Sequence, residues 1–121
     1  MNKLDALLSD GFSKIANWEF RNGKAKPDNL EWKDCAGSLY AFVTAGRIRY
    51  IGIATTVLRS RLDGYSYQIN DSVGSHIKKC LESGIEVAIL QKPRTGMTKQ
   101  QLESEESRYI AAYDPDWNVR S

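Results

Sequence analysis

Residues that build metal clusters and disulfide scaffolds are scarce in this sequence. It contains two cysteines, Cys35 and Cys80, and one histidine, His76. At most one disulfide could form, which is too few for a stapled secreted domain, and no zinc-ligand spacing is present. We therefore interpret both cysteines as ordinary thiols.

Long apolar runs are also absent. No run approaches the roughly 18 residues of a membrane span, and the N-terminal stretch lacks the apolar block of a secretory signal. The sequence therefore predicts a cytoplasmic protein with no membrane partner. The net charge is only +2, with a pI near 8.5, which permits a polyanionic partner without requiring one.

The content of the sequence is that of a single globular domain. Its 121 residues are 41% hydrophobic and 26% charged, close to soluble averages. Apolar spacing of three and four predicts a helix from Leu4 to Phe20, followed by a polar connector or arm over 21–34. The next prediction is a hairpin with strands over 38–43 and 48–53. It is followed by a helix over 57–65 and by a helix that is capped at Asp71 or Ser72 and ends at Gly84. A strand over 85–90 and a helix over 99–113, with a Thr98/Gln101 capping box, complete the prediction.

The predicted fold is α/β, with a small three-stranded antiparallel sheet flanked by helices. We expect residues 1–36 to form an extra N-terminal helix and arm that pack on a domain over 37–121.

Two charged residues stand near the apolar faces of their predicted helices. Glu106 falls in the middle of the face that carries Leu102 and Tyr109. A carboxylate there must pair with an arginine, bind a metal or open on a cleft, and the spacing leaves these alternatives open. Arg61 lies nearer the apolar stripe of its helix than Arg59 does, so it is the better candidate to reach over the sheet.

The predicted hairpin carries one tyrosine on each strand, Tyr40 and Tyr50. If they converge with Arg61 and Glu106, the site would hold a donor fork for phosphate, a hard oxygen ligand for Mg²⁺ and phenols to position water. This combination suits phosphate chemistry.

The order and spacing of these motifs resemble the GIY-YIG nuclease domain over residues 37–118. The resemblance rests on Tyr40 in Gly-Ser-Leu-Tyr, Tyr50-Ile51-Gly52, Arg61, Glu106 and Asn118. Three departures are visible: Ser-Leu-Tyr replaces Gly-Ile-Tyr, Ile53 stands where many members carry a lysine, and Arg61 lies one position later relative to Tyr50 than is usual. The last departure leaves a choice between Arg59 and Arg61, in which the helical spacing favours Arg61.

The resemblance implies a Mg²⁺-dependent endonuclease, with Mn²⁺ as a substitute, that nicks or cuts DNA by metal-assisted attack of water. Tyr40 and Tyr50 would line the water and phosphate site, Arg61 would bind the scissile phosphate, Glu106 would ligate the metal and Asn118 would support the site. The expected DNA contacts are Arg47, Arg49, Arg59, Tyr65, His76, Lys78 and Lys79, with Lys92, Arg94 and Lys99 as further phosphate contacts.

Several alternatives stay open at this stage. The chain could be a non-catalytic nucleic-acid-binding module of the same fold, or a nuclease directed at single strands or RNA. Which tyrosine acts on the water, and whether the chain forms a homo-oligomer, are not determined by these residues.

Overall fold

The structure is a computed structural model, and it describes residues 2–28, 36–65 and 73–118. The elements in chain order are α1 (Lys3–Ser9), β1 (Ser13–Arg21), β2 (Lys24–Pro27), β3 (Ser38–Thr44), β4 (Arg47–Ala54), α2 (Leu58–Tyr65), α3 (Val73–Glu82), β5 (Ala88–Pro93) and α4 (Lys99–Tyr113). The class is therefore α/β, as predicted.

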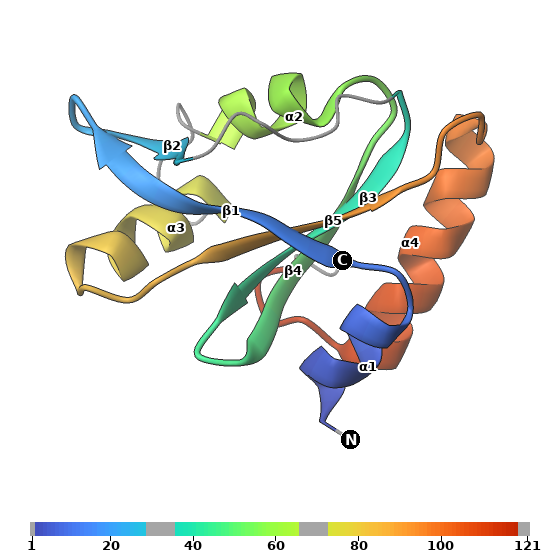
Figure 1. Ribbon diagram of the computed structural model, residues 1–121, viewed down its shortest axis with the longest axis horizontal. Helices are drawn as coiled ribbons and strands as arrows, with labels where there is room; N and C mark the ends of the chain where they lie inside the picture. The colour runs from blue at the N-terminus through green and yellow to red at the C-terminus, as the bar shows by residue number, and fades with distance from the viewer. Residues whose placement is uncertain (1, 29–35, 66–72, 119–121) are drawn as a thin grey trace.

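The strands form one antiparallel sheet in the order β2-β1-β5-β3-β4 (Figure 1). The predicted three-stranded sheet is wrong, because β1 and β2 extend it beyond β5. The predicted division of the chain at residue 36 stays a prediction, but strands from both sides of that boundary share this sheet.

The predicted helix over 4–20 is wrong beyond its first two turns. α1 ends at Ser9, and Gly11 then takes a φ of 103°, which a helix cannot accommodate. The chain continues as β1, where Trp18 donates its backbone N–H to the Val87 carbonyl at 2.9 Å. Pairing with β5 thus overrides a local apolar spacing that a helix would also satisfy.

A tight turn joins β1 to β2. Its central residues, Asn22 and Gly23, have φ values of 51° and 77°, as a type I′ hairpin turn requires. Asn-Gly is the preferred sequence for this turn because both residues tolerate positive φ. This dipeptide was the signal for the hairpin inside the segment that we predicted to be a connector.

The predicted hairpin over 38–53 is confirmed. β3 pairs with β4 so that Thr44 lies opposite Arg47, and Ala45 and Gly46 make another turn with positive φ. α2 follows as predicted, whereas β5 begins at Ala88, three residues after the predicted start. The two candidate caps of α3, Asp71 and Ser72, lie outside the described residues.

α4 spans the predicted residues. Thr98 accepts a hydrogen bond from the Gln101 backbone at 3.1 Å, and the Gln101 side chain accepts one from Thr98 at 2.9 Å, which completes the capping box. The helix ends where Asp114 adopts the left-handed conformation.

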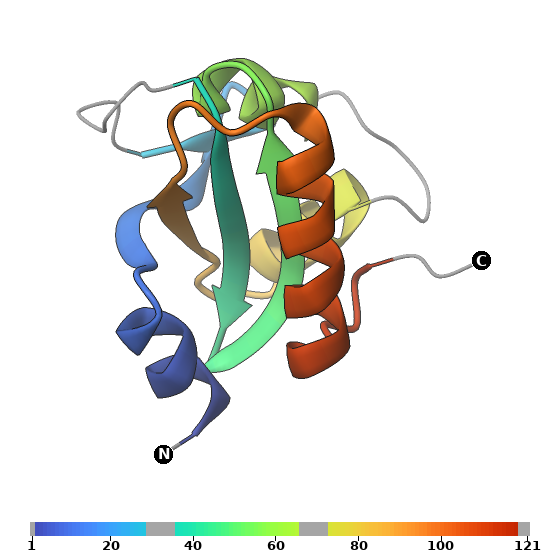
Figure 2. The ribbon, with the colours of Figure 1, turned by 90° about the vertical axis from the view of Figure 1, so that its right-hand side faces the viewer.

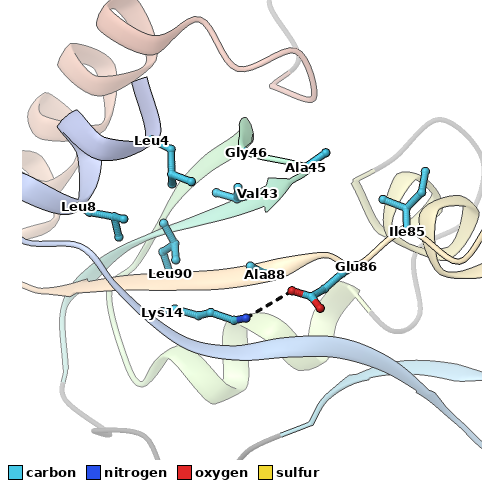
Figure 3. Close-up of a pocket in the computed structure, with 10 residues that line it drawn as sticks. All are labelled: Leu4, Leu8, Lys14, Val43, Ala45, Gly46, Ile85, Glu86, Ala88 and Leu90. Carbon is cyan, nitrogen blue, oxygen red and sulfur yellow. Dashed lines mark hydrogen bonds and ion pairs between the residues drawn. The ribbon is translucent and has the colours of Figure 1, made fainter. Parts of the chain in front are cut away.

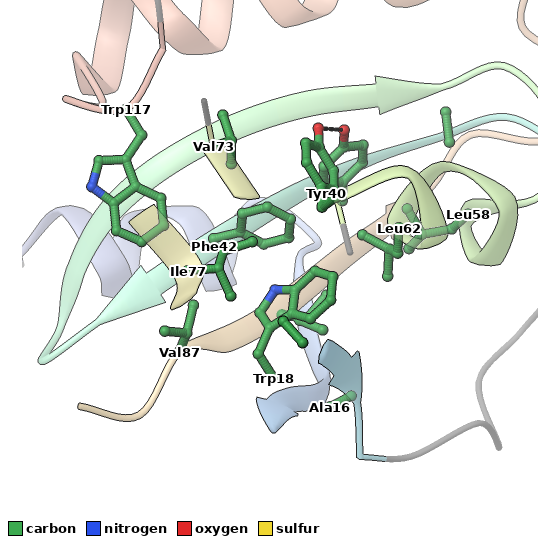
Figure 4. Packing of buried hydrophobic residues seen from close by; sticks show 14 residues of the cluster. Ala16, Trp18, Tyr40, Phe42, Leu58, Leu62, Val73, Ile77, Val87 and Trp117 are labelled. Carbon is green, nitrogen blue, oxygen red and sulfur yellow. Dashed lines mark hydrogen bonds between the residues drawn. The ribbon is translucent and has the colours of Figure 1, made fainter. Parts of the chain in front are cut away.

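Each face of the sheet carries its own hydrophobic cluster, because successive side chains of a strand point to opposite faces. Tyr40 and Phe42 pack with Trp18 under α2 and α3 (Figure 4). Leu39 and Ala41 pack on the other face, in a cluster with residues of α1 and α4. Figure 2 shows the ribbon of α4 running alongside β4. The two phenols predicted for the site therefore lie on the α2 and α3 side.

Within the described residues no helix is long and apolar enough to cross a membrane. Cys80 is a free thiol, as predicted, and Cys35 lies outside the described residues.

Candidate active site

Three tyrosines from three elements meet over β3 and β4, at one edge of the sheet. The register places Tyr40 of β3 opposite Gly52 and Tyr50 of β4 opposite Phe42, so the two rings are diagonal neighbours with centroids 6.1 Å apart. Tyr65 of α2 joins them: its hydroxyl lies 2.5 Å from that of Tyr40 and donates to that of Tyr50 at 3.3 Å. The three phenols form one hydrogen-bonded chain.

Tyr65 was predicted only as a DNA contact, but its hydroxyl is the central member of this phenol chain. It follows Arg61 by four residues, which puts both side chains on the same face of α2. That spacing was the available signal for its place in the site.

Arg61 reaches the phenols from α2. Its Nε donates a hydrogen bond to the Tyr40 hydroxyl at 3.2 Å, and its guanidinium carbon lies 5.6 Å from the centre of the Tyr65 ring. The guanidinium of an arginine is charged at neutral pH, and this hydrogen bond holds it against the Tyr40 hydroxyl. A fixed cation therefore stands beside the phenol chain.

Burial decides the protonation of two of the phenols. It raises the pKa of both Tyr40 and Tyr65 above the ordinary value for tyrosine, because a phenolate would lose its hydration there, and Tyr50 adds to the rise. Tyr40 and Tyr65 therefore keep their protons at neutral pH and can act as hydrogen-bond donors, not as bases. Tyr50 is less buried than either, so it is the phenol with the best access to water.

The tyrosines pack so closely because residue 52 has no side chain. A Cβ on Gly52 would lie 2.6 Å from both Cζ and Oη of Tyr40, and 2.9 Å from Cε2 of Tyr50. Such contacts are well inside van der Waals separation. The glycine of Tyr50-Ile51-Gly52 thus provides the space in which the two rings meet.

We expect Gly52→Ala to destabilise the protein by about 1–3 kcal/mol, the usual cost of overpacking, and to displace Tyr40 from Arg61. Urea unfolding measures the first effect. Gly64→Ala is the matched control: Gly64 lies inside α2, and a Cβ added there would meet nothing within 4 Å, so alanine should stabilise by about 0.5–1 kcal/mol. Equal stabilities for the two variants would contradict the packing argument.

Glu106 approaches from α4, which packs along β4. Its carboxylate is half-buried; burial raises its pKa, the like charge of Glu103 raises it further, and Arg61 opposes the rise. The neighbouring Glu105 forms an ion pair with Arg94 at 2.8 Å. Among the described residues no ion pair with an arginine includes Glu106. Of the alternatives for Glu106, pairing with an arginine is therefore not the one observed.

Asn118 holds the C-terminal segment against the outer edge of β4. Its Oδ1 accepts from the Ile51 backbone N–H at 3.0 Å and its Nδ2 donates to the Ile51 carbonyl at 2.9 Å. The backbone N–H of Trp117 donates to the Arg49 carbonyl at 2.7 Å. Asn118 therefore acts on the residue between Tyr50 and Gly52, through the backbone.

The predicted DNA contacts have different surroundings. Arg49 is engaged within the protein, since it donates to Thr44 at 2.7 Å and to Asp116 at 2.6 Å. His76 stacks on Trp117 with ring centroids 5.2 Å apart. Lys78 is half-buried, and the exposed members of the set are Arg47, Arg59 and Lys79.

Two of the further phosphate contacts are also engaged within the protein. Lys92 donates to the Tyr109 hydroxyl at 2.8 Å, and Arg94 pairs with Glu105. Both cations fasten α4 to β5 and the loop after it, which leaves them less suited to phosphate than we predicted.

The donor set is compatible with a single Mg²⁺ ion. No group of three or more candidate ligands gathers among the described residues, but Mg²⁺ typically keeps several waters and takes one or two carboxylates. Glu106 supplies one hard oxygen ligand, half-buried and close enough to Arg61 for their charges to interact. A cation would also relieve the like-charge repulsion from Glu103.

A separate cavity of about 670 Å³ lies on the α1 side of the sheet (Figure 3). Its walls are mainly apolar and include Leu4, Leu8 and Leu90, and two further lining residues, Lys14 and Glu86, form an ion pair at 3.4 Å. None of the predicted site residues lines it. Its chemistry does not suit a phosphate.

Two solved structures share this fold. A mutant of EndoII from bacteriophage T4 matches with a TM-score of 0.76 at 18% identity, over 98% of this chain and 100% of that chain. The restriction endonuclease HPY188I, in complex with product DNA, matches with a TM-score of 0.57 at 15% identity, over 94% of this chain and 82% of that chain. No family model and no curated protein sequence matches. The chain is thus similar in fold to two nucleases.

Proposed function

We propose that the protein is a Mg²⁺-dependent endonuclease of the GIY-YIG type that hydrolyses DNA phosphodiester bonds. The observation that carries this proposal is the meeting of a charged arginine with a chain of three phenols, near a carboxylate outside the described ion pairs. The fold likeness to two nucleases, one of them solved with product DNA, supports the same reading.

In this proposal each side chain has a part set by its surroundings. Arg61 binds the non-bridging oxygens of the scissile phosphate, where negative charge grows in the transition state. Tyr40 and Tyr65 stay protonated and hold Arg61 and Tyr50 in place through their hydrogen bonds. Tyr50 orients the attacking water, whose proton passes to solvent.

Glu106 would hold Mg²⁺, which when bound supplies electrostatic stabilisation of the charge on the leaving 3′ oxygen. The raised pKa of Glu106 means that this carboxylate is ionised only at a higher pH than an exposed one. Asn118 keeps Ile51, and with it the Tyr50 side chain, at the edge of β4.

Duplex DNA would bind mainly through its phosphates. The exposed Arg47, Arg59 and Lys79 can make such contacts, and affinity should then fall steeply with salt.

The test is incubation of the purified protein with supercoiled plasmid, single-stranded DNA and RNA, each with Mg²⁺, Mn²⁺ or EDTA. We expect Mg²⁺ and Mn²⁺ to support nicking or linearisation of the plasmid and EDTA to stop it. Preferred cleavage of single-stranded DNA or RNA would contradict duplex DNA as the substrate and keep the proposed chemistry. Binding of nucleic acid without cleavage of any substrate would favour the non-catalytic module and contradict the proposed activity.

A further inference from the structure

An open cleft of about 480 Å³ lies beside the phenol chain, between the β4–α2 connection and the start of α4. It is lined by Ile53 and Ala54 at the end of β4, by the hydroxyl-bearing Thr55, Thr56 and Ser60, and by the cations Arg61 and Lys99. Arg61 is the only member of the candidate active site among its described lining residues. The cleft is therefore adjacent to the candidate active site and shares one cation with it.

The chemistry of this cleft suits an anion. It combines two cationic side chains, Arg61 and Lys99, with hydroxyl groups from Thr55, Thr56 and Ser60, and the lining residues that the structure describes include no carboxylate. Cations and hydroxyls are the groups that proteins use to hold phosphate oxygens.

The walls of the cleft are joined by backbone hydrogen bonds through Gly37. Its N–H donates to the Thr56 carbonyl at 3.3 Å, and its carbonyl accepts from the Arg94 N–H at 2.9 Å. Gly37 has a φ of 96°, and a Cβ there would lie 2.9 Å from the Arg94 carbonyl oxygen. These bonds tie the loop before α2 to the loop before α4, the two loops beside which the cleft lies.

We propose that this cleft binds the phosphate next to the scissile phosphate on the same nucleic-acid strand, with Lys99 as its cationic contact. The inference rests on the proposed function for the identity of the scissile phosphate. Arg61 contacts the phenol chain and also lines the cleft, so a strand with its scissile phosphate at Arg61 would bring the neighbouring phosphate to the cleft. The contact is to the backbone, so it is independent of base sequence.

The test compares the salt dependence of duplex binding for the wild type, Lys99→Gln and Lys24→Gln, with EDTA present so that no cleavage occurs. Lys24 is an exposed lysine of β2, at the opposite edge of the sheet, and serves as the matched control. Loss of one phosphate contact should lower the slope of log K against log salt by about 0.9 for Lys99→Gln and leave it unchanged for Lys24→Gln. Equal slopes for all three proteins would overturn the inference.

A second measurement uses cleavage. Once the cut bond is mapped, a neutral methylphosphonate is placed at each flanking linkage in turn. At one of the two linkages, the methylphosphonate should slow cleavage by the wild type several-fold. The same substitution should not slow cleavage by Lys99→Gln further, because the variant and the neutral linkage remove the same contact. Additive losses would contradict a shared contact. If the wild type binds DNA but never cleaves it, the proposed activity is contradicted. The salt dependence of binding would still decide whether Lys99 contacts a phosphate.

Discussion

Glu106→Ala should abolish Mg²⁺-dependent nicking of supercoiled plasmid. The variant removes the carboxylate proposed to hold the metal, and metal stabilisation is worth several kcal/mol in such reactions, so the rate should fall by about 10³-fold or more. The fold should survive, because Glu106 is in none of the described ion pairs and alanine favours helix. Gel quantification of nicked plasmid gives the rate, and thermal unfolding monitors the fold.

The matched control is Glu82→Ala, which removes an exposed carboxylate at the end of α3. It should cleave at the rate of the wild type. If both Glu106→Ala and Glu82→Ala cleave at the full wild-type rate, Glu106 does not hold the metal. If both variants lose activity, the loss is not specific to Glu106 and the metal assignment fails, because removing a carboxylate should strengthen binding to DNA and not weaken it.

Arg61→Ala should lower the single-turnover cleavage rate by about 10²–10³-fold, the usual loss for one donor aimed at developing charge. The same change removes the hydrogen bond to Tyr40 and the cation over the Tyr65 ring. Arg61→Lys should recover little, because an ammonium group lacks the fork of donors that binds two phosphate oxygens. Rates are measured with protein in excess, so that weaker binding does not limit them.

Arg59→Ala is the informative comparison for this variant. Arg59 is exposed two residues earlier on α2 and is not in the described contact with the phenols, so its loss should weaken DNA binding in a salt-dependent way and leave the saturated rate within about tenfold. A larger rate loss for Arg59→Ala than for Arg61→Ala would reverse the assignment of the phosphate-binding arginine.

The elements that the sequence predicted well are the locally encoded ones. The hairpin of β3 and β4, the helix α2 and the capping box of α4 each depend on residues within a few positions of one another. The helix predicted over 4–20 was wrong beyond Ser9, because the choice between helix and strand over 13–21 is made by pairing with β5, more than 70 residues away. Only the Asn22-Gly23 dipeptide carried a local signal for the strands there.

The candidate site divides in the same way. Local sequence determined which residue types were available, and helical spacing alone marked Arg61 and Glu106 as charges near apolar faces. It also indicated that Tyr40 and Tyr50 share a hairpin. These features follow from bonding and periodicity within short segments.

Only the tertiary structure decided how those residues are used. It brought Tyr65 between the other two phenols, assigned the ion pair of α4 to Glu105 instead of Glu106, and engaged Arg49 with Asp116. It also brought Lys99 and Ser60 to the same cleft. Each of these depends on contacts between segments far apart in the chain. Long-range packing fixes such contacts through the whole sheet, and no short stretch of sequence contains the information for them.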